Sequence, residues 1–131
     1  MKSRHDELAH YCCELLSTVG PCVLRRMFGG YDISTDGLTI AILADLGQGE
    51  KLWLKASPES SAQFESAGCE RFTYLAKGKF RSMRFYSAPD EAMESVSEMA
   101  PWARLALEAA LEARQSKSRR VKKTALGPRT T

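Results

Sequence analysis

Two strand-type segments separated by a short glycine-containing turn set the architecture expected of this chain. Residues 38–44 form a strongly apolar run, whereas residues 51–56 alternate, with Leu52 and Leu54 on one side and Trp53 among lysines on the other. The intervening "DLGQGE" is rich in turn-forming residues. This combination favours an antiparallel meander with one covered face.

Further strand-type segments lie on either side of this pair. Residues 22–28 predict an earlier strand, which "GGYDIS" extends after a bend, and "TDG" predicts the turn into the apolar run. Residues 71–76 and 79–87 flank Lys77-Gly78, the centre of a predicted hairpin. The irregular spacing of apolar residues in the last of these strands indicates a β-bulge.

Helical patterns occur before, between and after the strands. Apolar residues at three- and four-residue steps predict a helix over residues 6–18. Ser57 at an N-cap position predicts a second helix, which Gly68 ends. Residues 90–114 are also helical in pattern, but Pro101 is expected to split them and to begin the strong final helix. The expected inward face of that helix consists of Trp102, Leu105, Ala106, Ala109 and Ala113.

The order of these elements is α-βββ-α-ββ-α, which predicts an α+β fold. We expect a two-layer sandwich with an antiparallel sheet and helices packed on one face. A chain of 131 residues is long enough to form one domain with its own core, and we place that domain at residues 1–114. Residues 115–131 contain few large apolar side chains and are predicted to be a disordered, basic tail.

The formal net charge of +3 is unevenly distributed. Beyond Gln115 the chain has six basic residues and no acid, whereas the thirteen basic residues before it are set against sixteen acids. The body is therefore slightly acidic, and its composition does not imply a basic patch. A basic tail of this kind suits nucleic-acid phosphates. The candidate residues are Lys117, Arg119, Arg120, Lys122 and Lys123.

Neither a metal centre nor an enzyme active site is predicted. The four cysteines form no CxxC pair and are expected to be reduced thiols, with no cofactor. His5 and His10 are five residues apart, which misses helical metal spacing, and a site of these two with Cys13 is the remaining metal alternative. No nucleophile motif occurs. No apolar run of membrane-spanning length and no signal peptide is present, so a cytoplasmic location is expected.

The stretch "LRRMFGGYDI" is the richest candidate for function. A phosphate-binding loop is disfavoured, because strand-type residues rather than a helix follow the glycines. The glycines mark a bend or a close backbone approach, and Arg25 and Arg26 should point to opposite faces, one of them pairing with an acid. Trp53 is expected either to be exposed beside lysines or to pack under helix edges. The candidate binding surface comprises Arg25, Arg26, Phe28, Gly29, Gly30, Tyr31, Trp53 and Lys55.

Several dispersed motifs resemble the N-terminal domain of TfoX, also called Sxy, a bacterial competence regulator. They are "RRMFGGYDI", "DGLTIAIL", "LWLK", "FESAGCERFTY", "MRFYSAPDEA" and "PWARLALEAAL", which span residues 5–114 in order. The resemblance implies a two-layer α+β domain and a role in transcriptional control of competence. Full-length TfoX has a second, C-terminal domain. Here only the short basic segment 115–131 follows the predicted domain, so a stand-alone N-terminal domain is expected.

Three functions follow as hypotheses. The first is a non-enzymatic regulatory or adaptor domain acting through protein–protein contact, including a homodimer. The alternative is nucleic-acid binding through the basic tail, and the third is a small-molecule site under the sheet.

Overall fold

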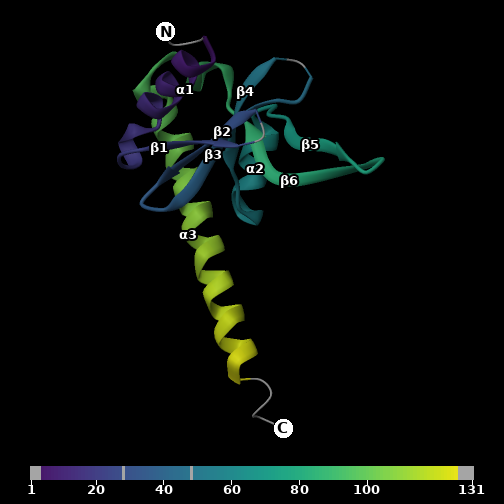
Figure 1. The fold of residues 1–131 in the computed structure, drawn as a ribbon. Coiled ribbons are helices and arrows are strands. Elements are labelled where there is room, and N and C mark those ends of the chain that lie inside the picture. The colour runs from purple at the N-terminus through teal and green to yellow at the C-terminus, as the bar shows by residue number, and fades with distance from the viewer. Residues whose placement is uncertain (1–3, 28, 48, 127–131) are drawn as a thin grey trace.

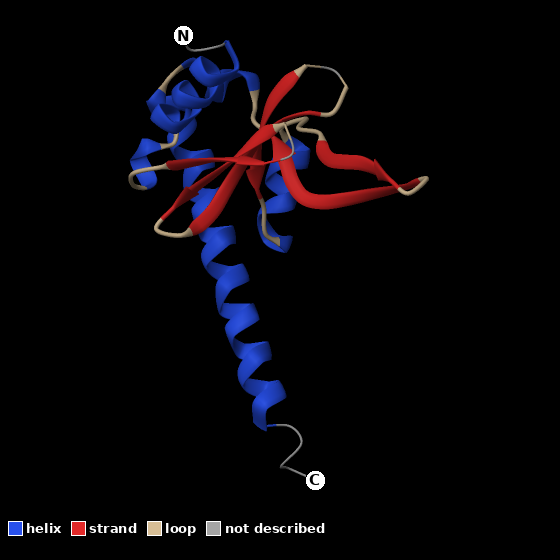
Figure 2. Ribbon diagram, in the orientation of Figure 1, coloured by secondary structure: helices blue, strands red, loops and turns tan. Residues whose placement is uncertain are grey.

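The computed structural model describes residues 4–27, 29–47 and 49–126. Six strands form one antiparallel sheet, and the helices pack on one of its faces (Figures 1 and 2). The elements are α1 (Arg4–Leu15), the short 3₁₀ helix η1 (Ser17–Val19), β1 (Val23–Met27), β2 (Gly30–Thr35), β3 (Leu38–Asp45), β4 (Glu50–Lys55), α2 (Pro58–Ser66), β5 (Arg71–Ala76), β6 (Lys79–Ser87), the 3₁₀ helix η2 (Asp90–Glu94) and α3 (Val96–Leu126). The predicted α+β class is confirmed.

The strands lie in the order β1-β2-β3-β4-β6-β5. One difference from the sequence prediction concerns the first strand. The chain does not bend there but reverses, because Met27 of β1 pairs with Gly30 of β2 and the two strands run antiparallel. Four strands therefore precede α2 rather than three. The predicted bulge is confirmed as a register shift between Arg71 and Thr73, where β5 pairs with β6.

The main core lies between the sheet and the helices. Ile33, Ile40 and Leu54 of the sheet are fully buried there, as is Met99 of α3. α3 packs on β3 and β4. Its buried face is made of small residues, which let a helix approach a sheet closely, namely Ala103, Ala106, Ala109 and Ala110. Of the expected inward face, Ala106 and Ala109 are buried, Trp102 and Leu105 are half-buried, and Ala113 is exposed.

α3 begins earlier than the sequence predicts. Ser95 caps it by accepting a hydrogen bond from the Glu98 amide at 3.2 Å, and Pro101 lies inside the helix instead of beginning it. Proline lacks an N–H, so the helix forgoes one bond to the Ser97 carbonyl. Both Ser97 and Pro101 lie on the exposed side of α3, and the helix continues through the proline.

α3 also ends later than predicted. Residues 115–126, expected to be disordered, are helical in backbone, and residues 127–131 lie outside the described ranges. The packed part of α3 supplies the helix nucleus, so each further residue adds one backbone bond. The added segment is rich in Lys and Arg, which are good helix formers. None of the helices in the described ranges combines the length and apolar character needed to cross a bilayer.

Replacing Ser57 with alanine should destabilise the protein by about 1 kcal/mol. Ser57 caps α2: its hydroxyl accepts from the Ser60 amide at 3.0 Å, and the Ser60 hydroxyl accepts from the Ser57 amide at 2.8 Å. Urea unfolding would measure the change. Ser66→Ala, at the exposed end of the same helix, is the control and should stay within about 0.5 kcal/mol of the parent. Equal effects of the two variants would contradict the capping role.

Candidate functional site

The two glycines of the opening stretch have a structural role. Gly30 lies so close to β3 that a Cβ added to it would be 2.1 Å from the carbonyl oxygen of Leu43. Gly29 has a φ of +80°, in the left-handed region that favours glycine. The predicted close backbone approach is therefore confirmed at Gly30, and β2 follows it as a strand.

The two arginines lie on opposite faces of β1, and each meets an acid. Arg25 Nη2 is 3.3 Å from Asp32 Oδ2 on the face away from the helices. Arg26 Nη2 is 3.3 Å from Asp6 Oδ1 of α1, on the helix side. Both guanidinium groups remain mostly exposed, with 76% and 79% of their side-chain surface open to solvent. The expected pairing with an acid thus holds for both arginines.

Asp32 interacts with several polar side chains on the outer face of the sheet. Its side chain is only 9% exposed, and the Thr39 hydroxyl donates to its carboxylate at 3.0 Å. Lys55 lies on the same face and is half-buried, and this burial lowers its pKa, while the nearby Asp32 acts in the opposite direction. We call Arg25, Asp32, Thr39 and Lys55 the outer-face charged group. It combines a buried anion with two cations that reach the surface.

Trp53 belongs to the interior of this face, not to its surface. It is only 3% exposed, so the expectation that it lies open beside lysines is wrong. Neither does a helix cover it: Phe72 of β5 meets its ring edge-on at 5.1 Å, and Ile42 and Phe85 complete a second apolar cluster. The hairpin of β5 and β6 brings these residues together across the sheet. Lys55 Nζ lies 5.1 Å from the centre of the Phe85 ring.

Tyr31 is buried on the helix side, so it too is absent from the exposed surface. Its hydroxyl donates a hydrogen bond to Asp6, which raises the pKa of Tyr31. Arg26 lies over its ring at 5.8 Å from the centroid. These contacts tie β1 and β2 to α1. Phe28, the last member of the candidate surface, lies outside the described residues.

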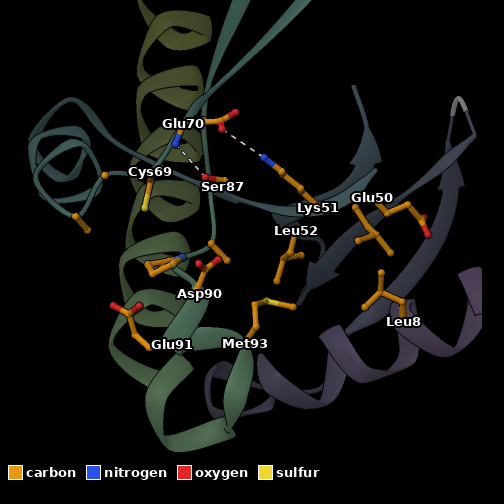
Figure 3. Close-up of a pocket in the computed structure, with 15 residues that line it drawn as sticks. Leu8, Glu50, Lys51, Leu52, Cys69, Glu70, Ser87, Asp90, Glu91 and Met93 are labelled. Carbon is orange, nitrogen blue, oxygen red and sulfur yellow. Dashed lines mark hydrogen bonds and ion pairs between the residues drawn. The ribbon is translucent and has the colours of Figure 1, made fainter. Parts of the chain in front are cut away.

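A cleft of about 530 Å³ lies between α1, β4 and η2 (Figure 3). Its rim includes the ion pair of Lys51 with Glu70 at 3.4 Å, and the Glu70 amide donates to the Ser87 hydroxyl at 2.9 Å. Burial and nearby acids raise the pKa of Cys69, so its thiol stays protonated. Sequence reasoning missed this cleft because its lining comes from segments far apart in the chain.

Two cysteines contact each other beside η1. Cys13 of α1 lies near Cys22, which precedes β1, and the interaction between the two thiols lowers the pKa of Cys22 and raises that of Cys13. The Cys22 thiol is also 3.6 Å from the Gly20 carbonyl oxygen, to which it donates. Cys12 is fully buried, and burial raises its pKa to about 12. Cys22 is therefore the thiol with the greatest thiolate character.

The Cys13→Ala variant is expected to move the pH profile of Cys22 alkylation to higher pH. The variant removes the neighbouring thiol that lowers the pKa of Cys22, so less of the reactive thiolate is present at neutral pH. Iodoacetamide labelling with site-resolved mass spectrometry over a pH series would measure the midpoint. Cys69→Ala is the control and should leave that midpoint in place. An unmoved midpoint in Cys13→Ala would contradict the thiol pairing.

Comparison with known protein families matches residues 14–110 to the TfoX N-terminal domain. The chain belongs to the TfoX N-terminal domain family. The match begins in α1 and ends in α3, so it includes the second apolar cluster, most of the main core and the outer-face charged group of this TfoX N-terminal domain. No curated protein matches the chain significantly.

Charge is unevenly distributed within the body of this TfoX N-terminal domain, whose overall composition implies no basic patch. Residues 71–89 contain five cations and no acid, and β5 and β6 occupy most of that range. Net charge conceals the segregation because it averages over the whole body. The absence of acids from these residues was the available signal in the sequence.

Proposed function

We propose that this TfoX N-terminal domain is a non-enzymatic regulatory or adaptor module that acts by protein–protein contact in the bacterial cytoplasm. Its family membership supports a regulatory role connected with competence or transcription. The outer-face charged group is the observation behind the contact surface. Asp32 pairs with Arg25, and its charge also acts on Lys55. Arginine is enriched in binding hot spots.

This surface favours a partner that presents carboxylates. The Asp32 carboxylate is nearly covered, so the exposed charge of the group is the cationic part of Arg25 and Lys55. An acidic segment of another protein, or of a second copy of this chain, would complete the pairing without reorganising either side chain.

Site-specific photo-crosslinking tests this proposal. A photoreactive residue replaces Arg25 or Lys55 in one set of variants, and the exposed Glu94 of η2 in the control. We expect a discrete crosslinked product from the first set in bacterial cells and none from the control. A product of twice the chain mass would identify a homodimer. Identical products from all three positions, or none from any, would contradict the proposed surface.

Nucleic-acid binding through the end of α3 is the second candidate function, and the projection of α3 favours it. The helix continues past the body through Leu126 (Figure 1). Its last part is acid-free and includes the five cations Lys117, Arg119, Arg120, Lys122 and Lys123.

Ending the chain at Arg114 should flatten the salt dependence of duplex DNA binding. Each phosphate neutralised contributes about 0.9 to the slope of log K against log salt, so the six cations that the truncation removes account for up to about 5.4. Fluorescence anisotropy over a salt series measures that slope for both chains, and circular dichroism confirms that the shorter chain is folded. The same slope in both chains would exclude the helix end as the binding site.

A further inference from the structure

We propose that the outer half of the β5–β6 hairpin is an arm that binds double-stranded DNA, with Leu75 and Phe80 as an apolar wedge. This inference goes beyond the protein contact proposed above. It uses different residues from both the outer-face charged group and the end of α3. We call residues 73–82 the arm.

The arm projects from the body of the domain. β6 pairs with β4 only at Phe85, Tyr86 and Ser87, so the preceding part of β6 is paired with β5 alone. Figures 1 and 2 show this two-stranded ribbon extending away from the helices. The turn at its end has positive φ at both Lys77 and Gly78, as in the tight turns that suit twisted hairpins. The predicted hairpin centre is thereby confirmed.

Two large apolar residues face each other near the end of this arm. Leu75 pairs with Phe80 across the ribbon, so both side chains lie on the same face. Leu75 is 62% exposed and Phe80 is 80% exposed. By contrast, Phe72 and Phe85 at the base of the hairpin are buried in the second apolar cluster. The aromatic residues at the base thus stabilise the fold, and the pair near the tip is available to a partner.

The charge around this pair identifies the partner as a polyanion. Lys77, Lys79 and Arg81 belong to the same arm as Leu75 and Phe80 and are all exposed. Strand alternation directs Lys79 and Arg81, which pair with Ala76 and Tyr74, to the opposite face of the ribbon from the apolar pair. None of these three cations forms an ion pair with a side chain in the described ranges. Acids are absent from the whole stretch 71–89, so nothing on the hairpin offsets these charges.

The shape of the arm favours duplex DNA over other polyanions. A two-stranded ribbon fits a groove of B-DNA, whereas the deep, narrow major groove of an RNA duplex excludes side chains. DNA-bending proteins insert Phe or Leu between base steps while cations hold the flanking phosphates. The arm supplies both parts of that combination, with an exposed Leu75–Phe80 pair and the cations Lys77, Lys79 and Arg81 on one ribbon. A single-strand site would instead need several aromatic residues along its path.

Binding of the full-length chain to a labelled 20-base-pair DNA duplex tests the arm. In the combined Lys77→Gln, Lys79→Gln, Arg81→Gln variant, we expect affinity at least about tenfold weaker at 0.1 M salt and a salt slope reduced by about 2.7. Arg104→Gln, an exposed cation on α3, is the control and should remain within about twofold of the parent. Anisotropy over a salt series reports both quantities.

Phe80→Ala separates the wedge from the charges. We expect it to leave the salt slope unchanged, to weaken binding by roughly five- to a hundredfold, and to reduce DNA bending measured by energy transfer between the duplex ends. Val23→Ala, which truncates another exposed apolar residue, should change neither the affinity nor the DNA bending. The proposal is overturned if the arm variants bind the duplex like the parent, or if single-stranded DNA, duplex RNA or an acidic polypeptide binds the arm more tightly than the DNA duplex.

Discussion

Replacing Gly30 with alanine is expected to lower the free energy of unfolding by at least about 3 kcal/mol. The new methyl group would meet the carbonyl oxygen of Leu43 at 2.1 Å, well inside contact distance. A flexible side chain could swing away from such a contact, but a backbone atom in the middle of a sheet cannot. The strand would have to separate from β3, breaking ladder hydrogen bonds that the core depends on.

Gly29→Ala is the matched control for this prediction. No atom lies within 4 Å of a Cβ added at Gly29, so only its φ of +80° is unfavourable for alanine. That conformation costs about 1–2 kcal/mol in residues other than glycine. Urea unfolding followed by tryptophan fluorescence would compare the two variants. Equal losses would mean that backbone conformation, and not the approach of β2 to β3, explains the adjacent glycines.

Trp53→Ala should destabilise the protein by about 3–5 kcal/mol. Trp53 is 3% exposed, and the variant would leave a cavity beside Phe72 and Phe85 that neighbouring strands cannot easily fill. Any loss of partner binding in this variant would therefore follow from unfolding. The structure therefore predicts that Trp53→Ala lowers the free energy of unfolding.

Phe80→Ala supplies the comparison, because it also truncates an aromatic residue to a methyl group. Phe80 is 80% exposed, so its removal should change the free energy of unfolding by no more than about 0.5 kcal/mol. Thermal and urea unfolding of both variants would establish the difference. If the two losses were similar, the assignment of Trp53 to the interior and Phe80 to the surface would be wrong.

Local signals in the sequence were sufficient for most of the elements. The cap at Ser57 and the turn at Lys77-Gly78 depend on neighbouring residues only, and both occur as predicted. Prolines and glycines were harder to interpret. Gly29 and Gly30 produce a reversal rather than a bend because β1 pairs with β2, and Pro101 is accepted within α3 at an exposed position.

The candidate site was less accessible from sequence. Alternation correctly placed Trp53 and Lys55 on one face, but it could not show that this face has its own apolar cover. That cover comes from β5 and β6, which fold back beside β4 after the intervening α2. The partners of Arg25 and Arg26 are likewise set by strand register and helix position. Pairing across strands depends on residues far apart in the chain, whereas a sequence pattern reports only the conformation of neighbouring residues.

Because α3 is one continuous helix, the number of residues in it sets the direction in which anything attached to its end points. From Arg114 to Leu126 the helix advances by about 18 Å, at about 1.5 Å per residue. Inserting one residue in that interval would turn everything beyond it by about 100° around the helix axis, whereas inserting seven would restore the original direction to within about 20°. A protein joined there could thus be aimed by adding residues, without altering either folded unit.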